Sequence, residues 1–371
     1  MTIAADRQRI AIVGAGIVGA AIALYLAEAG AHVTVLECTA PAAGATGKSF
    51  ACLNADVVDP AYRELRLRSM ALWRDLDAFL GLSIRWAGRL AWIDRAEEVE
   101  RLRRRAPMPN GASSGARMLE LGEIGHLSPG LQPRSAAAAI FDPGDGHLDP
   151  HRVTRRLLER ARQRGAAVLF PCKVLWLALR NGRLHRLVTS RGAIEADLVV
   201  VAAGGGVPAL LGPIGYAPPL SLSPGLLTHS QPIAPVSAIV HNGPGGLKLR
   251  QTADGCLVGT DGATPPGVST IADLPDEHAR DALGETMLAA IAHRIKGAEV
   301  ARFDRLTVGM RPIPADGMPV VGAVPGVEGV YLAVTHSGVT LAPIVGNLLA
   351  GELLGGAVSD LLSPFRPDRF G

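Results

Sequence analysis

The sequence between residues 9 and 37 holds a glycine motif that limits the chain to a few folds. The stretch "RIAIVGAGIVGAAIALYLAEAGAHVTVLE" has the spacing G-x-G-x-x-G, with its glycines at Gly14, Gly16 and Gly19. A short β-branched run before the glycines predicts a buried strand, and the apolar spacing after them predicts a helix that ends at Gly30. A second strand follows and finishes on Glu37. The pattern therefore predicts one strand–helix–strand unit of a parallel α/β sheet.

The uncharged run from residue 10 to residue 27 also has to be weighed as a membrane span or a signal peptide. As a helix it would cover roughly 27 Å, close to the ~30 Å hydrocarbon core of a bilayer. However, glycines fill its first half, where each would cost about 1 kcal/mol in a helix interior. A signal peptide would lead into a cleavage site rather than into a second strand. We therefore expect no transmembrane span.

In the setting of a strand–helix–strand unit the glycines indicate a nucleotide site. They permit a tight turn that brings backbone N–H groups to a pyrophosphate at the helix N-terminus. The carboxylate of Glu37 can accept hydrogen bonds from a ribose diol, whereas its charge would repel a 2′-phosphate and so disfavours NADP. These residues alone leave NAD and FAD open.

Two later stretches repeat the order of buried strand, glycine-rich turn and helix. One is "LVVVAAGGGVPALL" at 198–211, and the other runs from "GVYLAV" into "THSGVTLAPIVGNLLAG" at 329–351. Strand-like pieces separate these units. We therefore predict an α/β fold with α+β insertions. A doubly wound Rossmann-type domain (1–82, 146–212 and 306–371) is interrupted by a smaller, sheet-based substrate domain (83–145 and 213–305).

Local signals place several helices. Residues 60–80 have helical apolar spacing, and another helix is expected at 276–296. A third has Asp149 as N-cap and should stop at Gly165. His147 and His151 flank this cap, and we expect them at the surface or in capping rather than as metal ligands. In the helix expected at 60–80, the residues predicted to lie in the core are Leu65, Met70, Leu72, Trp73 and Leu76.

Charge and cysteine content exclude several classes of protein. The formal net charge is +3, and the densest basic run, "RLRRR" at 101–105, lacks the interleaved aromatic residues of a nucleic-acid surface. The four cysteines contain no C-x-x-C pair, so they predict neither a zinc site nor a disulfide framework. We expect a cytoplasmic protein without a bound metal, and peripheral attachment to the inner membrane is left open.

Taken together, these stretches resemble the D-amino-acid oxidase, glycine oxidase and D-amino-acid dehydrogenase family of FAD-dependent oxidoreductases. The resemblance covers nearly the whole chain. Besides the first glycine motif it rests on "GATGKSFA", "DGHLDP", "GMRPIPADGMPVVG" and "VTHSGVTLAPIVG". It implies FAD as the cofactor. Because no cysteine follows Cys256, the covalent attachment found in the sarcosine-oxidase branch is not expected, and the FAD should be non-covalent.

The resemblance also implies which residues contact FAD. The matching positions are Gly14, Gly16, Ile17 and Val18 for the pyrophosphate, Glu37 for the adenosine ribose, and Thr46, Lys48 and Ser49 for a second flavin loop. The backbone of Val174 matches a contact to the adenine edge, and Ala203 with Gly204 matches a strand end near the cofactor. The loop beneath the flavin pyrimidine matches Ser337, Gly338, Val339 and Thr340, and its partial positive charge would stabilise reduced flavin.

On the substrate side, Arg311 in "GMRP" matches the arginine that family members use to hold an amino-acid carboxylate. A guanidinium pairs bidentately with a carboxylate and stays charged at any working pH. His336, beside the pyrimidine loop, could tune the flavin, meet the substrate or be structural. Ser337 stands where the glycine-oxidase branch has a second arginine, which disfavours glycine itself as substrate.

Two further residues are considered and not assigned. Lys248 in "GLKL" is similar in position to the oxygen-activating lysine of the sarcosine-oxidase branch, but the hairpin after it is expected to put it out of register. The sparse tyrosines offer no clear active-site residue, and Tyr216 is the only one considered.

The resemblance implies oxidation of a carboxylate-bearing amine, a D-amino acid or an N-substituted amino acid. Hydride transfer to flavin N5 would give an imine that hydrolyses to a keto acid. One alternative is an FAD-dependent 2-hydroxy-acid dehydrogenase, because Arg311 would hold either substrate. Another is the flavin subunit of a hetero-oligomeric amino-acid or opine dehydrogenase. The electron acceptor is left open between oxygen, a quinone and a partner protein.

Overall fold

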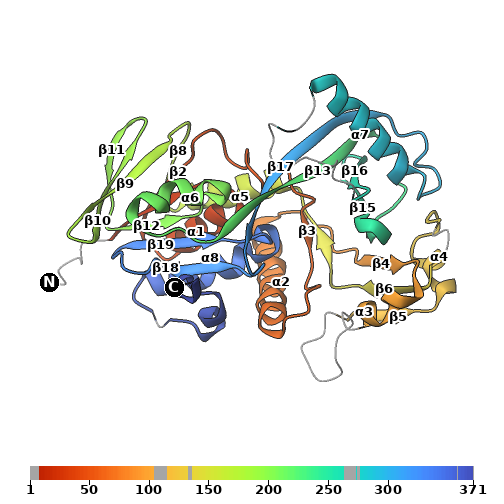
Figure 1. Ribbon diagram of the computed structural model, residues 1–371, viewed down its shortest axis with the longest axis horizontal. Helices are drawn as coiled ribbons and strands as arrows, with labels where there is room; N and C mark the ends of the chain where they lie inside the picture. The colour runs from red at the N-terminus through yellow and green to blue at the C-terminus, as the bar shows by residue number, and fades with distance from the viewer. Residues whose placement is uncertain are drawn as a thin grey trace.

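The computed structural model describes residues 8–103, 115–132, 136–262, 273, 276–356 and 358–370. The basic run at 101–105 therefore lies partly outside the described residues. Two large sheets organise the described chain, one of six strands and one of eight (Figure 1).

The six-stranded sheet has the strand order β18-β19-β12-β1-β2-β8. Neighbouring strands are parallel, except that β18 runs antiparallel to β19. The first glycine turn follows the central strand, where the chain passes from one side of the strand order to the other. The strands are β1 (Arg9–Val13), β2 (His32–Leu36), β8 (Ala167–Leu169), β12 (Leu198–Val201), β18 (Val320–Ala323) and β19 (Val330–Val334).

Both faces of this sheet are covered, which explains why its strands are continuous apolar runs. On β1, Ile10 and Ile12 belong to a core shared with helices α1, α5 and α8, whereas Ala11 and Val13 face a second core on the other side. A three-stranded antiparallel sheet and helix α6 cover that second face. The elements are α1 (Ile17–Glu28), α5 (Pro150–Gln163), α6 (Val207–Leu211), α8 (Gly338–Leu353), β9 (Val174–Arg180), β10 (Arg183–Thr189) and β11 (Gly192–Glu195).

The eight-stranded sheet has the order β17-β13-β16-β15-β14-β4-β6-β5, and helix α7 packs on β13, β16 and β17. Its two long strands, β13 and β17, run between the two sheets in Figure 1. The elements are β4 (Arg89–Ile93), β5 (Arg117–Leu119), β6 (Ala138–Asp142), β13 (Leu220–Pro232), β14 (Val240–Asn242), β15 (Lys248–Gln251), β16 (Cys256–Thr260), β17 (Phe303–Pro314) and α7 (Glu277–Ala292).

Shorter elements complete the described chain. They are the strand pair β3 (Cys52–Leu53) and β7 (Gly146–His147), helices α2 (Pro60–Leu80), α3 (Val99–Arg103) and α4 (Ile124–Leu127), and 3-10 turns at Ala96–Glu98, Leu121–Glu123, Gly204–Gly206, Gly212–Ile214, Pro244–Gly246, Asp360–Phe365 and Pro367–Phe370.

The helices expected from local signals are confirmed. Helix α2 occupies 60–80 with Asp59 as N-cap, and α5 starts after Asp149, whose carboxylate accepts two backbone N–H groups. Four of the five core residues expected from α2 are buried, and Leu72 is half-buried against the same core. His147 was expected at the surface or in a capping role, and this prediction is wrong. It is buried, because β7 pairs with β3 in the interior and places the ring against Arg250.

The fold class is confirmed: a doubly wound parallel sheet is combined with a second, largely antiparallel sheet. The division into two domains at the boundaries given above stays a prediction. None of the helices in the described ranges is both long enough and apolar enough to cross a membrane. The described residues also contain no group of three potential metal ligands.

Candidate functional site

The first strand–helix turn accepts only glycine at two positions. Gly14 has φ +109°, and a Cβ there would lie 2.5 Å from the carbonyl oxygen of Ala202. At Gly19 a Cβ would lie 2.0 Å from the carbonyl oxygen of Gly14. The turn is therefore as tight as backbone packing allows, and its glycines place no side chain of their own over the N-terminus of α1. Such a helix end can receive an anion at its free N–H groups.

Glu37 lies directly over this turn. Its carboxylate accepts hydrogen bonds from the backbone N–H of Ala15 at 2.9 Å and of Thr39 at 2.9 Å. The segment before β9 runs alongside it, because the Cys172 N–H donates to the Glu37 carbonyl at 2.6 Å. Val174 follows two residues later. Glu37 and Val174, which were predicted to contact the two parts of an adenosine group, thus come from neighbouring segments.

The predicted second flavin loop joins the same turn. The hydroxyl of Thr46 accepts a hydrogen bond from the Ile17 N–H at 3.1 Å, so it occupies one of the free donors at the start of α1. Ser49 donates to the Thr46 carbonyl at 2.7 Å and closes the loop. Lys48 is exposed, and its Cβ would lie 3.1 Å from a Cβ added at Gly309 on β17. This loop therefore lies between α1 and the long strand β17.

The other two strand–helix turns meet the first one. A Cβ at Gly14 would come within 3.2 Å of the Cα of Ala203, at the end of β12. At the start of α8, a Cβ on Gly338 would come within 3.1 Å of Val18. The structure thus brings together the three glycine turns that the sequence analysis placed around one cofactor.

The cofactor-binding residues predicted from the sequence form a site that fits a dinucleotide. A tight glycine cradle, the N-terminus of α1 and a carboxylate hydrogen-bonded to the turn provide for a pyrophosphate and a ribose diol. Direct contact of each residue with FAD stays a prediction.

Arg311 lies on β17, two residues after Gly309, and alternate residues of a strand share a face. Its side chain extends across the neighbouring strand β13, where a Cβ at Gly225 would lie 3.1 Å from the Arg311 Cδ and Nε. Its Nη2 donates to the Ser223 hydroxyl at 2.9 Å and to the Pro224 carbonyl at 3.0 Å. The side chain is exposed, and no carboxylate in the described part of the chain forms an ion pair with it.

His336 lies within electrostatic range of Arg311. Although the ring is exposed, neighbouring protein atoms displace water around it and lower its pKa to about 4, and the charges of Arg311, Lys248 and Arg66 add to the effect. At neutral pH the imidazole is therefore uncharged. A neutral ring can hydrogen-bond to a ligand, but it contributes no positive charge to the site.

Two basic residues of β15, Lys248 and Arg250, were not assigned to the site from the sequence. Lys248 on β15 has its pKa lowered by the displacement of water and, in addition, by the charge of Arg311, so it lies within electrostatic range of Arg311. Arg250, two residues later, is buried, and its Nε donates to the Phe50 carbonyl at 2.7 Å. Alternation along β15 was the available signal, since it puts Lys248 and Arg250 on one face.

Tyr216 has a structural contact instead of an active-site position. It is buried in the core behind the six-stranded sheet, and its hydroxyl donates to the Pro367 carbonyl at 3.0 Å.

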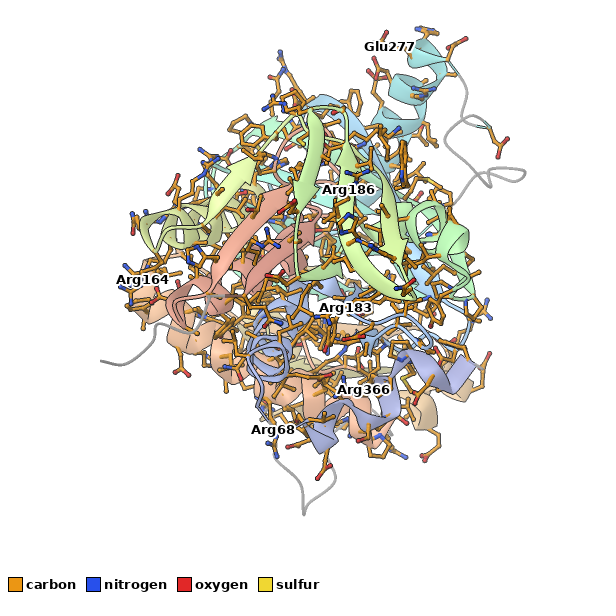
Figure 2. All side chains as sticks on the ribbon, turned by 90° about the vertical axis from the view of Figure 1, so that its left-hand side faces the viewer. Arg68, Arg164, Arg183, Arg186, Glu277 and Arg366 are labelled. Carbon is orange, nitrogen blue, oxygen red and sulfur yellow. The ribbon has the colours of Figure 1, made fainter. Side chains whose placement is uncertain are left out.

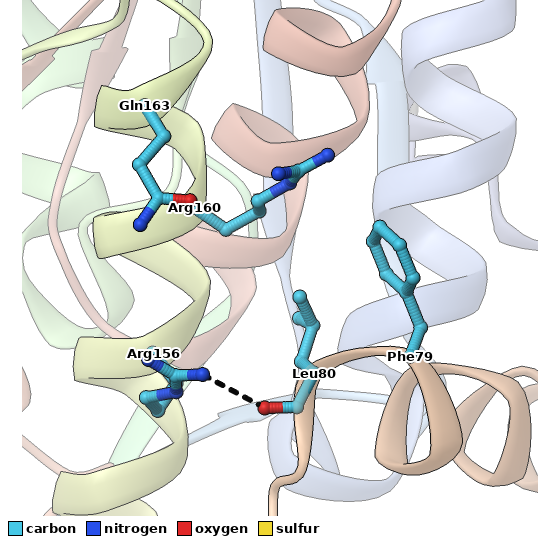
Figure 3. Close-up of a pocket in the computed structure, with 5 residues that line it drawn as sticks. All are labelled: Phe79, Leu80, Arg156, Arg160 and Gln163. Atoms are coloured by element: carbon cyan, nitrogen blue, oxygen red, sulfur yellow. Dashed lines mark hydrogen bonds between the residues drawn. The ribbon is translucent and has the colours of Figure 1, made fainter.

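A small surface pocket between α2 and α5 lies away from this site (Figure 3). Arg66, one of the charges that act on His336, lies on the same helix α2. The first lining residue of the pocket on α2, Phe79, comes thirteen residues after Arg66, which corresponds to roughly 20 Å along the helix axis. Both arginines of the pocket already have partners. Arg156 donates to the Leu80 carbonyl at 3.0 Å, and Arg160 forms an ion pair with Glu28 at 2.5 Å. Its lining residues are Phe79, Leu80, Arg156, Arg160 and Gln163.

Comparison with known proteins gives one family match and many relatives. Residues 9–352 match the model of the DAO family, described as FAD dependent oxidoreductase. Glycine oxidase from Bacillus licheniformis is 27% identical over 374 residues, which cover 96% of each chain. Human mitochondrial dimethylglycine dehydrogenase is 26% identical over 398 residues. That match covers 99% of this chain and 45% of the relative, so this chain spans less than half of its length.

Solved structures share the fold over the whole chain. L-proline dehydrogenase from P. horikoshii superimposes with a TM-score of 0.87 at 24% identity and covers 98% of both chains. Iminodiacetate oxidase from Chelativorans sp. BNC1 gives a TM-score of 0.82 at 25% identity, covering 97% of this chain and 99% of the other.

Proposed function

The chain belongs to the DAO family of FAD-dependent oxidoreductases, and from this premise we propose that it oxidises a carboxylate-bearing amine, either a D-amino acid or an N-substituted amino acid. The family assignment confirms the resemblance seen in the sequence and FAD as the cofactor. FAD, when bound, supplies the acceptor for a hydride at its N5. We further propose that it is held without a covalent bond, by the glycine turns, Glu37 and the loops described above.

The observation that carries the substrate proposal is the exposed guanidinium of Arg311, which forms no ion pair with a carboxylate of the described residues. It lies on the same strand face as Gly309, which packs against Lys48 of the proposed flavin loop. A carboxylate bound to Arg311 would therefore be held beside the cofactor loop. Such a contact orients the α-carbon, and orientation is a large part of what an enzyme supplies to a hydride transfer.

The properties of His336 favour an amine over a 2-hydroxy acid. An alcohol has to release its hydroxyl proton to a base as the hydride leaves, whereas a neutral amine can form the C=N bond with its own lone pair. An imidazole with a pKa of about 4 is a weak base at neutral pH. The names of the relatives support the same class, since glycine, dimethylglycine, proline and iminodiacetate all combine an amine with a carboxylate.

An anaerobic reduction screen tests the proposal. The purified yellow protein is mixed with matched pairs of compounds, D-alanine with D-lactate and sarcosine with glycolate, and the loss of flavin absorbance is followed. We expect bleaching by at least one amine and none by the hydroxy acids. Bleaching by the hydroxy acids alone would establish the 2-hydroxy-acid dehydrogenase instead.

The electron acceptor needs a separate experiment. The chain alone is reduced with the best amine and then exposed to oxygen, a soluble quinone or an artificial dye. Turnover of the lone chain with any of them supports an independent enzyme. If reduction requires a co-purifying partner, the chain is a flavin subunit of a larger dehydrogenase.

A further inference from the structure

One face of helix α2 holds the start of helix α8. Three of its residues, spaced i, i+3 and i+7 and so lying on one side of the helix, contact residues 337–340. The Ser69 hydroxyl donates to the Thr340 carbonyl at 2.6 Å, and the Trp73 indole N–H donates to the Val339 carbonyl at 3.0 Å. The third, Arg66, donates to the Ser337 hydroxyl. The loop that was predicted to lie beneath the flavin pyrimidine is therefore fixed from behind by α2.

Arg66 is a buried charge with neutral partners. Its side chain is 7% exposed. Its Nη1 donates to the side-chain oxygen of Asn54 at 2.9 Å, its Nη2 donates to the Tyr62 hydroxyl at 3.2 Å, and its guanidinium lies 4.6 Å from the centre of the Tyr62 ring. The buried Nε has no acceptor among the residues that the structure describes. No carboxylate within the described ranges forms an ion pair with Arg66.

An uncompensated buried charge is costly, so its persistence calls for an anion that binds nearby. The direction of that anion follows from Ser337. This residue is the N-cap of α8, but its hydroxyl does not cap the helix and instead accepts the hydrogen bond from Arg66. The positive end of the α8 dipole and the charge of Arg66 therefore act at the same loop. His336, next to Ser337, already experiences the charge of Arg66.

We propose that Arg66 is the positioning residue that provides the counter-charge for reduced flavin. Hydride transfer breaks the substrate C–H bond and adds two electrons and one proton to the flavin ring. The ring therefore gains one negative charge, while the substrate nitrogen lone pair forms the C=N bond and makes the product cationic. Arg66, acting through Ser337, stabilises that negative charge at the pyrimidine end. The inference rests on the proposed FAD site but not on the identity of the amine.

The test is the two-electron reduction potential of the bound FAD. Holoprotein is reduced by dithionite against a dye of known potential, without any amine. Arg66→Gln, which can still hydrogen-bond, should lower the equilibrium constant for reduction at least tenfold, or about 30 mV for a two-electron couple. Arg66→Lys keeps the charge and should stay within about threefold of the wild type.

Arg68→Gln is the matched control on the same helix. Arg68, labelled in Figure 2, has a side chain that is 56% exposed and pairs with Glu64 at 2.6 Å, so its charge is screened by solvent. The Arg68→Gln variant should leave the reduction potential of the bound FAD unchanged. Sulfite binding is a second measurement, because sulfite adds to flavin N5 and places a negative charge on the same ring. Arg66→Gln should weaken it about tenfold, in line with the shift in potential.

Any of three results would overturn the proposal. One is an Arg66→Gln protein that retains FAD and has the wild-type potential. Another needs no variant: a wild-type potential no higher than that of free FAD, measured in parallel, means that the site supplies no counter-charge. Equal losses in the Lys and Gln variants would also contradict it, since they would indicate a role in packing. Failure of the amine screen affects none of these measurements.

Discussion

One nitrogen of the Arg311 guanidinium, Nη1, remains available to a ligand in the wild type. Replacing Arg311 with methionine removes it. Nη2 uses its two N–H groups on Ser223 and Pro224 at 2.9 and 3.0 Å, and Nε faces the Ser223 carbonyl at 3.4 Å. The two N–H groups of Nη1 have no acceptor among the described residues. A substrate carboxylate is therefore expected at Nη1, on an arginine that its neighbouring strand already holds in place.

The size of the effect follows from this geometry. A hydrogen bond to a charged group contributes about 1.5–3 kcal/mol, and two N–H groups are available. We take the lower value for each, because the side chain is exposed and water competes for it. The loss in transition-state binding is then about 3 kcal/mol, or roughly a hundredfold in kcat/KM.

The assay follows anaerobic flavin reduction over a range of amine concentrations, with FAD content measured on the same samples. Arg305→Met is the matched control: Arg305 is on the same strand, its side chain is 59% exposed and it pairs with Asp304. We expect Arg311→Met to lose activity while it retains FAD, and Arg305→Met to resemble the wild type. If the two variants reduce equally fast, Arg311 does not bind the carboxylate and the substrate proposal fails with it.

Three further predictions concern the supporting structure. Gly225→Val places a Cβ about 3.1 Å from the Arg311 side chain, so it should raise the KM for the amine without loss of FAD; an unchanged KM would contradict this. Gly14→Ala, at φ +109° and 2.5 Å from the Ala202 carbonyl oxygen, should abolish FAD binding and lower the melting temperature; a yellow protein would refute it. His241 is fully buried, and burial lowers its pKa to about 4. At this residue the unfolded chain therefore binds more protons than the folded chain between about pH 6.5 and pH 4, and acidification through this range should remove about 3 kcal/mol of unfolding free energy through His241 alone. In urea titrations His241→Asn should flatten this slope, and an equal slope would exclude His241.

The parallel sheet and its three glycine turns could be predicted from the sequence because each is a local pattern. A β-branched run, a glycine turn and an apolar helix follow one another within about thirty residues, and the crossover rule then fixes how the unit folds. Gly14 illustrates this, because the motif predicts a tight turn at this position and the structure has the Ala202 backbone too close for any side chain there.

The environment of Arg66 could not be predicted in the same way. In the sequence it is one of several arginines on an amphipathic helix, and the surface it faces comes from residues more than 270 positions later, as in the Ser69–Thr340 hydrogen bond (|i−j| = 271). One signal was present: Arg66 is spaced with Ser69 and Trp73 on the buried stripe, so a charge lay on the face expected to be apolar. Whether such a charge is buried depends on which distant segment packs against the helix, and no local sequence pattern specifies that segment.

Lys248 and Arg311 show the same difficulty on the substrate side. They lie on β15 and β17, which are separated by two strands in the sheet order, yet the charge of Arg311 contributes to lowering the pKa of Lys248. The expectation that Lys248 lies out of register for oxygen activation stays a prediction.

The cations of the site differ in exposure in a way that matches two kinds of anion. Arg311 is exposed, so water can solvate it whenever no ligand is bound, which suits a substrate that leaves after each turnover. Arg66 is buried, and water can compensate it only poorly. A buried cation is suited to a resident group whose charge changes in place, as reduced flavin does. If this division is correct, high salt should weaken substrate binding through Arg311 and leave the flavin potential set by Arg66 almost unchanged, because screening acts on exposed charges far more than on buried ones.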